Sequence, residues 1–231
     1  MTTGGRSIRR AVHPLAMAAG AVAVLAALPP ARVDAQGIDR SKPPVLSPPA
    51  DLVVPAVRSA TLANGLKLHV VEMHELPVVQ IVLSVAGGGR LDGERPGLAS
   101  FTANMLDEGA GKRDAFGIAA EAEFLGAQLA TGATWDDITV SLRVPRRNLN
   151  PALDLMSDVV LRPTFAAAEV ARQRDLRLAN ILQQRDQPQQ MASLAFNAIV
   201  FPEGHPYHRP LSGDSAATAA LDSAIVRQFY D

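Results

Sequence analysis

Three short segments of the chain have the hydrophobic pattern of β-strands. Residues 66–73 and 78–86 are rich in aliphatic side chains and are separated by a short break at 74–77, so we expect them to form an antiparallel pair. A turn signal, Ala63-Asn64-Gly65, precedes the first of them. Within residues 135–144 apolar side chains recur at every second position, which predicts a half-buried strand with one face formed by Ile138, Val140, Leu142 and Val144.

Most of the remaining chain is predicted to be helical. Apolar residues at helical spacing, or helix-start signals, predict helices over residues 98–106, 115–129, 148–161, 165–185, 189–200 and 222–230. Two strands come early and the helices flank one more strand, which favours an α+β fold with helices packed on one face of an antiparallel sheet. The last helix stops at Tyr230-Asp231 without a capping glycine, so we expect a domain that is truncated at its C-terminus.

The N-terminal part of the chain is set apart by its composition. Basic residues are followed by an uncharged apolar run at 15–28, which is shorter than the roughly 20 residues of a spanning helix. We interpret residues 1–35 as a signal peptide, residues 36–56 as a proline-rich linker and residues 57–231 as the folded domain. This predicts a periplasmic or secreted protein. An uncleaved anchor is the alternative, in which case the chain meets a membrane only through this segment.

Charge and cysteine content exclude several classes of function. The 22 basic and 23 acidic residues give a net charge of −1, so the chain lacks the excess of Lys and Arg that binding of nucleic acid requires. There is no cysteine, which excludes disulfides, thiolate zinc sites and cysteine nucleophiles. Any metal would have to be held by histidines and carboxylates.

Candidate catalytic residues are few. His205 and His208 lie in a loop with two prolines, and their spacing allows metal binding, but the sequence supplies no third ligand beside them. His69 and His74 would face opposite sides of a shared strand. The glycines at 87–89 follow a strand but lack the downstream residues of a phosphate loop, and no nucleophile elbow occurs.

A set of motifs from residue 57 to the end resembles the pitrilysin/insulinase family of zinc metallopeptidases, which includes the mitochondrial processing peptidase subunits. The motifs are weak singly, and it is their order and spacing that carry the resemblance. They are Leu62-Ala63-Asn64-Gly65-Leu66, Val85-Ala86-Gly87-Gly88-Gly89-Arg90-Leu91-Asp92, Gly97-Leu98-Ala99-Ser100-Phe101-Thr102-Ala103-Asn104-Met105-Leu106, Leu125-Gly126-Ala127-Gln128-Leu129-Ala130, Asp137-Ile138-Thr139, Arg172-Gln173-Arg174-Asp175 and His205-Pro206-Tyr207. The resemblance implies that this chain is the N-terminal domain of a pitrilysin-like peptidase.

The chain departs from that family where the chemistry should be. Active members carry H-x-x-E-H on the helix after the glycine-rich turn, where two histidines bind zinc and the glutamate activates a water. The matching positions are Ser100, Ala103 and Asn104, and the family's third ligand corresponds to Asn180. Because neutral amide and hydroxyl groups are weak zinc ligands, we expect neither zinc nor a catalytic residue here. Asp107 and Glu108 are expected on a solvated helix face.

The resemblance also implies a peptide-binding edge strand at Leu129, Ala130, Thr131 and Gly132, continuing to Ala133. The leading hypothesis is a catalytically silent subunit that binds peptide or unfolded protein beside a catalytic homologous subunit or a second homologous domain. One alternative is an active zinc metalloendopeptidase with displaced ligands such as His205 and His208. Another is a stand-alone peptide-binding module, and an ordinary protected edge is the alternative for the strand itself.

Overall fold

The computed structural model describes residues 54–231, so the predicted signal peptide at 1–35 and most of the predicted linker at 36–56 lie outside the described residues. Strands form three small antiparallel sheets. The strands are β1 Val57–Thr61, β2 Lys67–Val71, β3 Val78–Ala86, β4 Gly109–Ala110, β5 Arg113–Asp114, β6 Gln128–Ala133 and β7 Asp137–Pro145. The largest sheet has the order β3-β7-β6.

Helices fill the connections and the C-terminal half of the described chain. The α-helices are α2 Leu98–Asn104, α3 Ala115–Leu125, α4 Leu149–Leu161, α5 Ala167–Gln184, α6 Pro188–Val200, α7 Ser215–Ala219 and α8 Ser223–Tyr230. Short 3₁₀ turns are η1 Gly88–Leu91, η2 Arg146–Asn148 and η3 Pro206–His208. Within residues 54–231, no helix combines the length and the apolar character needed to cross a bilayer.

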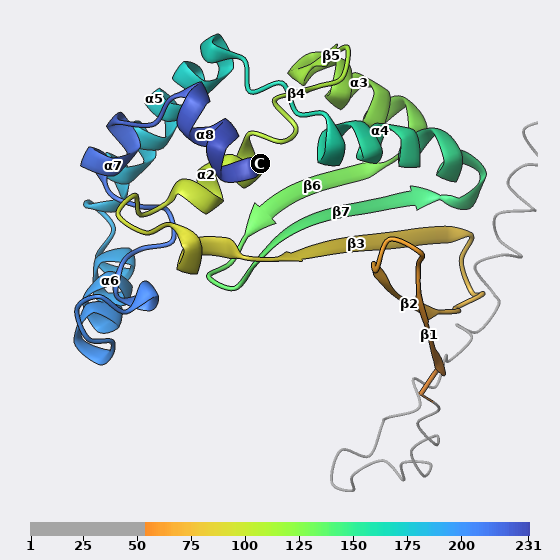
Figure 1. Cartoon of the computed structure of the whole chain (residues 1–231), viewed down its shortest axis with the longest axis horizontal. Helices are drawn as coiled ribbons and strands as arrows, with labels where there is room; N and C mark the ends of the chain where they lie inside the picture. The colour runs from red at the N-terminus through yellow and green to blue at the C-terminus, as the bar shows by residue number, and fades with distance from the viewer. Residues whose placement is uncertain (1–53) are drawn as a thin grey trace, which may run out of the picture. The chain divides into compact units, whose positions relative to one another are not determined.

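The predicted α+β class with helices on one face of an antiparallel sheet is confirmed. Helices α3 and α4 lie along one face of β3-β7-β6, while α2, α5, α7 and α8 gather beyond the end of that sheet (Figure 1). The alternation predicted for 135–144 holds because Val140, Leu142 and Val144 are all buried against the helices. Ile138 is only partly buried but contacts the same core.

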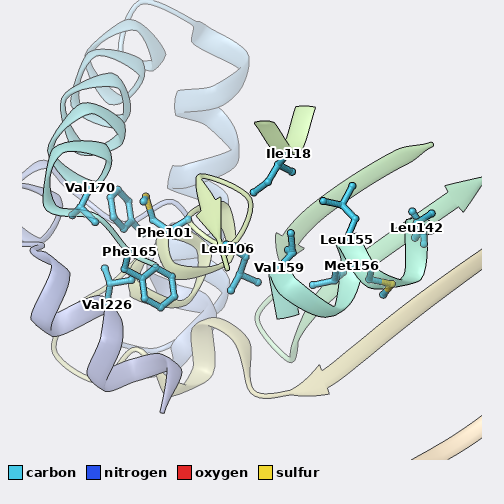
Figure 2. Packing of buried hydrophobic residues seen from close by; sticks show 14 of the residues in the cluster. Phe101, Leu106, Ile118, Leu142, Leu155, Met156, Val159, Phe165, Val170 and Val226 are labelled. Carbon is cyan, nitrogen blue, oxygen red and sulfur yellow. The ribbon is translucent and has the colours of Figure 1, made fainter. Parts of the chain in front are cut away.

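One hydrophobic core joins the sheet to the helices. Phe101, Phe165, Val170 and Val226 meet between α2, α5 and α8, and Leu142 meets Leu155 and Met156 between β7 and α4 (Figure 2). Both groups belong to the same cluster of buried side chains. Burial of a large aliphatic or aromatic side chain stabilises a fold by about 1.5–3 kcal/mol, so this core fixes where α2 sits relative to α5 and β6.

Two predictions about individual elements were wrong. The two early strands do not pair with each other: β2 pairs with β1 across the Asn64-Gly65 turn, and β3 pairs with β7. The helix predicted over 115–129 ends at Leu125, because Gly126 has the left-handed conformation, with φ 62°, that stops a helix. Residues 128 and 129 therefore belong to strand β6 rather than to the helix.

Candidate functional site

The entrance to α2 is shaped by one aspartate and one close backbone crossing. Asp92 accepts hydrogen bonds from the backbone N–H groups of Gly97 and Ala99, each at 2.7 Å, and so satisfies the first turn of the helix. Burial raises the pKa of the Asp92 carboxyl, although these hydrogen bonds oppose the shift. Gly97 has φ 91°, and a Cβ there would lie 2.6 Å from the Ser212 carbonyl oxygen. Only glycine permits the 211–213 segment to cross so close to α2.

Two of the four positions singled out by the motif lie together. Asn104 at the end of α2 and Asn180 on α5 line one pocket of about 200 Å³, whose wall also includes Phe101 and Arg177. The sequence separates the two asparagines by most of the domain, but the packing of α2 beside α5 brings them to the same cavity. The predicted correspondence of Asn180 with the family's third ligand position is consistent with this geometry.

The third position, Ser100, is bound by a positively charged side chain. Arg177 donates a hydrogen bond from Nη1 to the Ser100 hydroxyl at 2.8 Å, and the same nitrogen lies 3.2 Å from the Gly97 carbonyl and 3.4 Å from that of Ser212. Its guanidinium carbon lies 5.0 Å from the centroid of the Phe101 ring. Desolvation lowers the pKa of Arg177 to about 10, with Asp92 acting in the opposite direction, so the group is charged at neutral pH.

The fourth position does not join this pocket. Ala103 is fully buried and lines a separate, mainly apolar cavity with Thr102, Leu106 and residues of β3, β7 and α8. A methyl group at that place offers no proton acceptor. The position that carries the general base in active family members therefore lies in the hydrophobic interior of this chain.

Asp107 and Glu108 are not on a solvated helix face, so that prediction was wrong. Asp107 accepts a hydrogen bond of 3.4 Å from the Thr131 hydroxyl on β6, and burial raises the pKa of its carboxyl. Glu108 accepts from Arg172 and Gln173 on α5. The two carboxylates connect the end of α2 to the strand on one side and to the helix on the other.

The segment predicted to bind peptide is an edge strand. Thr134 N–H donates to the Asp137 carbonyl at 2.8 Å, so Thr134 and Asp137 form the first hydrogen-bonded pair of the β6-β7 ladder. Because such pairs alternate along an antiparallel ladder, the register assigns Ala130 and Gly132 to hydrogen bonds with β7. The backbone groups of Leu129, Thr131 and Ala133 therefore face the other side, where none of the strands in residues 54–231 pairs with β6.

The histidines are engaged in local contacts. His205 stacks on Phe201 with ring centroids 4.9 Å apart and accepts from the Tyr207 N–H at 3.1 Å, while His208 Nδ1 lies 2.9 Å from the Phe201 carbonyl. His69 contacts the Ser59 hydroxyl at 2.8 Å. In the part of the chain that the structure describes, no three His, Asp or Glu side chains gather as a metal-binding group. Among residues 54–231, His205 and His208 therefore belong to no group of three metal-binding side chains.

Sequence reasoning missed Arg177. It belongs to a helix that was expected to be charged, where an arginine is ordinarily solvated. The available signal was its spacing: Arg177 lies three residues before Asn180, on the same face of α5, and so within reach of any residue that Asn180 approaches. Its contact with Ser100 depends on how α2 and α5 pack, which the local sequence does not specify.

The fold and the site together describe a peptidase-like domain in which the positions matched to zinc ligands carry a serine and two asparagines, with an arginine beside them. The model of the insulinase family, peptidase family M16, matches residues 69–215. The chain therefore belongs to that family, and the resemblance drawn from the motifs is confirmed.

Individual proteins and solved structures are also similar to this chain. It is 27% identical over 188 residues to an uncharacterized zinc protease of Mycobacterium tuberculosis, covering 81% of this chain and 43% of that protein. The crystal structure of a peptidase M16 inactive domain from Pseudomonas fluorescens is 34% identical with a TM-score of 0.72, covering 76% of this chain and 43% of the other. The periplasmic protease PqqL of Escherichia coli shares the fold, with 18% identity, a TM-score of 0.68 and coverage of 77% and 21%. This chain thus spans less than half the length of these relatives.

Proposed function

We propose that this chain is a catalytically silent member of peptidase family M16 that binds extended peptides and works beside a zinc-bearing homologous partner. The observation that carries the proposal is the contact of Arg177 with Ser100, at 2.8 Å, in a pocket shared by Asn104 and Asn180. The guanidinium cation contacts the residue at the position where active family members carry a zinc ligand.

The residues present do not fit zinc. Zinc in proteins is held by thiolate, imidazole or carboxylate groups, and this pocket offers amides, a hydroxyl and a guanidinium. Arginine has no lone pair to donate to a metal and keeps its charge at neutral pH. Ala103 stands at the base position and cannot accept a proton, so the site has no general base for peptide hydrolysis.

Peptide binding rests on β6. The outward backbone groups of Leu129, Thr131 and Ala133 can pair with an extended chain without any catalytic residue. The partner would be a homologous subunit or a second homologous domain, since this chain matches less than half of its relatives. The neighbour named an inactive domain supports catalytic silence. The neighbour named a periplasmic protease, together with the predicted signal peptide, supports a periplasmic location.

Incubation of the chain with zinc and unfolded casein is expected to give no cleavage above a sample treated with a chelator, because the residues of the site fit neither zinc nor the role of general base. An M16 homologue from the same source with an intact H-x-x-E-H should cleave, and adding this chain should raise its rate on long substrates. The measurement is release of soluble peptide over time.

Cleavage by the isolated chain that a chelator abolishes would overturn catalytic silence and favour the displaced-ligand alternative. Peptide binding that leaves every homologue's rate unchanged would favour a stand-alone binding module instead.

Replacing Thr131 by proline should weaken binding of a fluorescein-labelled unstructured peptide by about tenfold, because proline removes an outward N–H that the peptide would use, and one hydrogen bond contributes about 0.5–1.5 kcal/mol. The matched control is Thr131→Val, which loses the same hydroxyl but keeps the N–H. Fluorescence anisotropy measures both. Equal affinity of the two variants would remove the peptide from this edge.

A further inference from the structure

Most of the hydrogen-bonding capacity of Arg177 is unused by the described residues. A guanidinium has five N–H donors, and here only Nη1 donates to protein acceptors within residues 54–231. Nε and Nη2 have no partner within those residues. Among the described residues, the side-chain N and O atoms that are both fully buried and without a partner are Thr102 Oγ1 and Ser223 Oγ, so Nε and Nη2 are not sealed from solvent. Arg177 is one of the residues that line the pocket.

No carboxylate neutralises this arginine directly. None of the ion pairs within residues 54–231 includes Arg177. Asp92 acts on it only at longer range, because its two oxygens accept from Gly97 and Ala99. The pocket wall contains no Asp or Glu, and it adds the uncharged amides of Asn104, Asn180 and Gln184. The cavity is therefore a partly desolvated positive site with further polar side chains around its charge.

We infer that this pocket binds a carboxylate group of a peptide ligand, held by Nε and Nη2 of Arg177. This inference rests on the proposed peptide-binding function and assigns it a specificity. The two donors lie side by side in the guanidinium plane, which matches the two oxygens of a carboxylate. One carboxylate balances the single positive charge, whereas a phosphate dianion would bring uncompensated charge into a partly desolvated cavity. Leu176 and Ile181 supply apolar wall for the carbon atoms next to it.

The first test uses N-acetylglycine, which has a carboxylate, and N-acetylglycinamide, which has none. We expect N-acetylglycine to shift NMR resonances of pocket residues in the intact chain, and to bind at least about tenfold more tightly than the amide. Arg177→Met should remove this preference. The matched control is Arg185→Met, which deletes an equal charge from an exposed residue at the end of α5. Equal binding of the two compounds, or equal loss in both variants, would overturn the inference.

A second variant leaves Arg177 and its contacts to α2 in place. Asn180 lines the pocket, so Asn180→Glu should supply an internal carboxylate that competes for the guanidinium. We expect it to weaken N-acetylglycine binding by about tenfold, while Asn180→Gln, of the same size and uncharged, keeps it. Unchanged affinity in Asn180→Glu would contradict the assignment.

Labelled peptides locate the carboxylate and separate this inference from the proposed function. Three peptides of one sequence would carry a free C-terminus, an amidated C-terminus, or an amidated C-terminus with one internal Glu. A preference for the first or the third over the second, lost in Arg177→Met, identifies the source. Equal peptide binding overturns the inference but keeps the peptide edge. N-acetylglycine binding without any peptide binding overturns the proposed function alone, and tighter binding of inorganic phosphate overturns the carboxylate assignment.

Discussion

Rebuilding the three ligands by Ser100→His, Asn104→His and Asn180→Glu is expected to give only weak zinc binding until Arg177 is also replaced by methionine. Nη1 of Arg177 lies 2.8 Å from the Ser100 hydroxyl, so it occupies the space that an imidazole at this position needs. A metal ion about 4 Å from the guanidinium would be repelled by about 4 kcal/mol for each unit of its charge, at an effective dielectric constant near 20. The added Arg177→Met should therefore raise zinc affinity by at least about 100-fold.

Competition with a zinc-sensitive dye measures this difference, and the control set replaces Arg177→Met by Arg185→Met. Binding is the appropriate readout rather than peptide cleavage, because Ala103 lies in the hydrophobic interior and a carboxylate there would not reach the pocket without rearrangement. Tight zinc binding by the three-ligand variant with Arg177 intact would show that the arginine does not exclude the metal.

Asp158→Ala should destabilise the domain by about 3 kcal/mol, since it removes a buried carboxylate that accepts from both Arg113 and Arg162. The Asp158 side chain is 7% exposed and the Arg113 side chain 27%. Arg113 would keep its bond of 2.5 Å to Glu121, which limits the loss. For a chain of this size, the melting temperature should fall by about 6–12 °C.

The matched control is Asp154→Ala, the same chemical change at an exposed position of α4. Asp158→Asn should lie between the two, because an amide keeps the shape and part of the hydrogen bonding. Thermal unfolding followed by circular dichroism measures all three variants. A melting temperature of Asp158→Ala equal to that of Asp154→Ala would show that the ion pairs contribute nothing to stability.

The sequence predicted the fold where the information is local. The alternation around Val140 and Leu142 and the Asn64-Gly65 turn are properties of a few neighbouring residues, and both are confirmed. The pairing of β3 with β7 was missed because it joins segments more than fifty residues apart, as Ser84 opposite Thr139 illustrates. The end of α3 was missed although Gly126 signalled it, because alanines on both sides favour helix.

The sequence predicted which residue types stand at the positions of the candidate site, but it did not predict how these residues are arranged in space. The motif singled out Asn104 and Asn180, and both line one pocket. It could not reveal that Ala103 belongs to a different cavity or that Glu108 binds α5, because these contacts depend on the packing of α2. The resemblance located the edge strand, but the direction of its backbone groups required the register of β6 on β7.

The partial withdrawal of Arg177 from bulk water affects what this side chain contributes to the stability of the fold. Its lowered pKa means that the folded state disfavours the charged form relative to the unfolded chain, where the group is fully hydrated. This cost offsets part of what the contacts of Arg177 with Ser100 and Phe101 contribute to stability. Arg177 thus adds less to stability than its contacts alone would give, which makes α5 the part of the domain to compare among family members that bind different peptides.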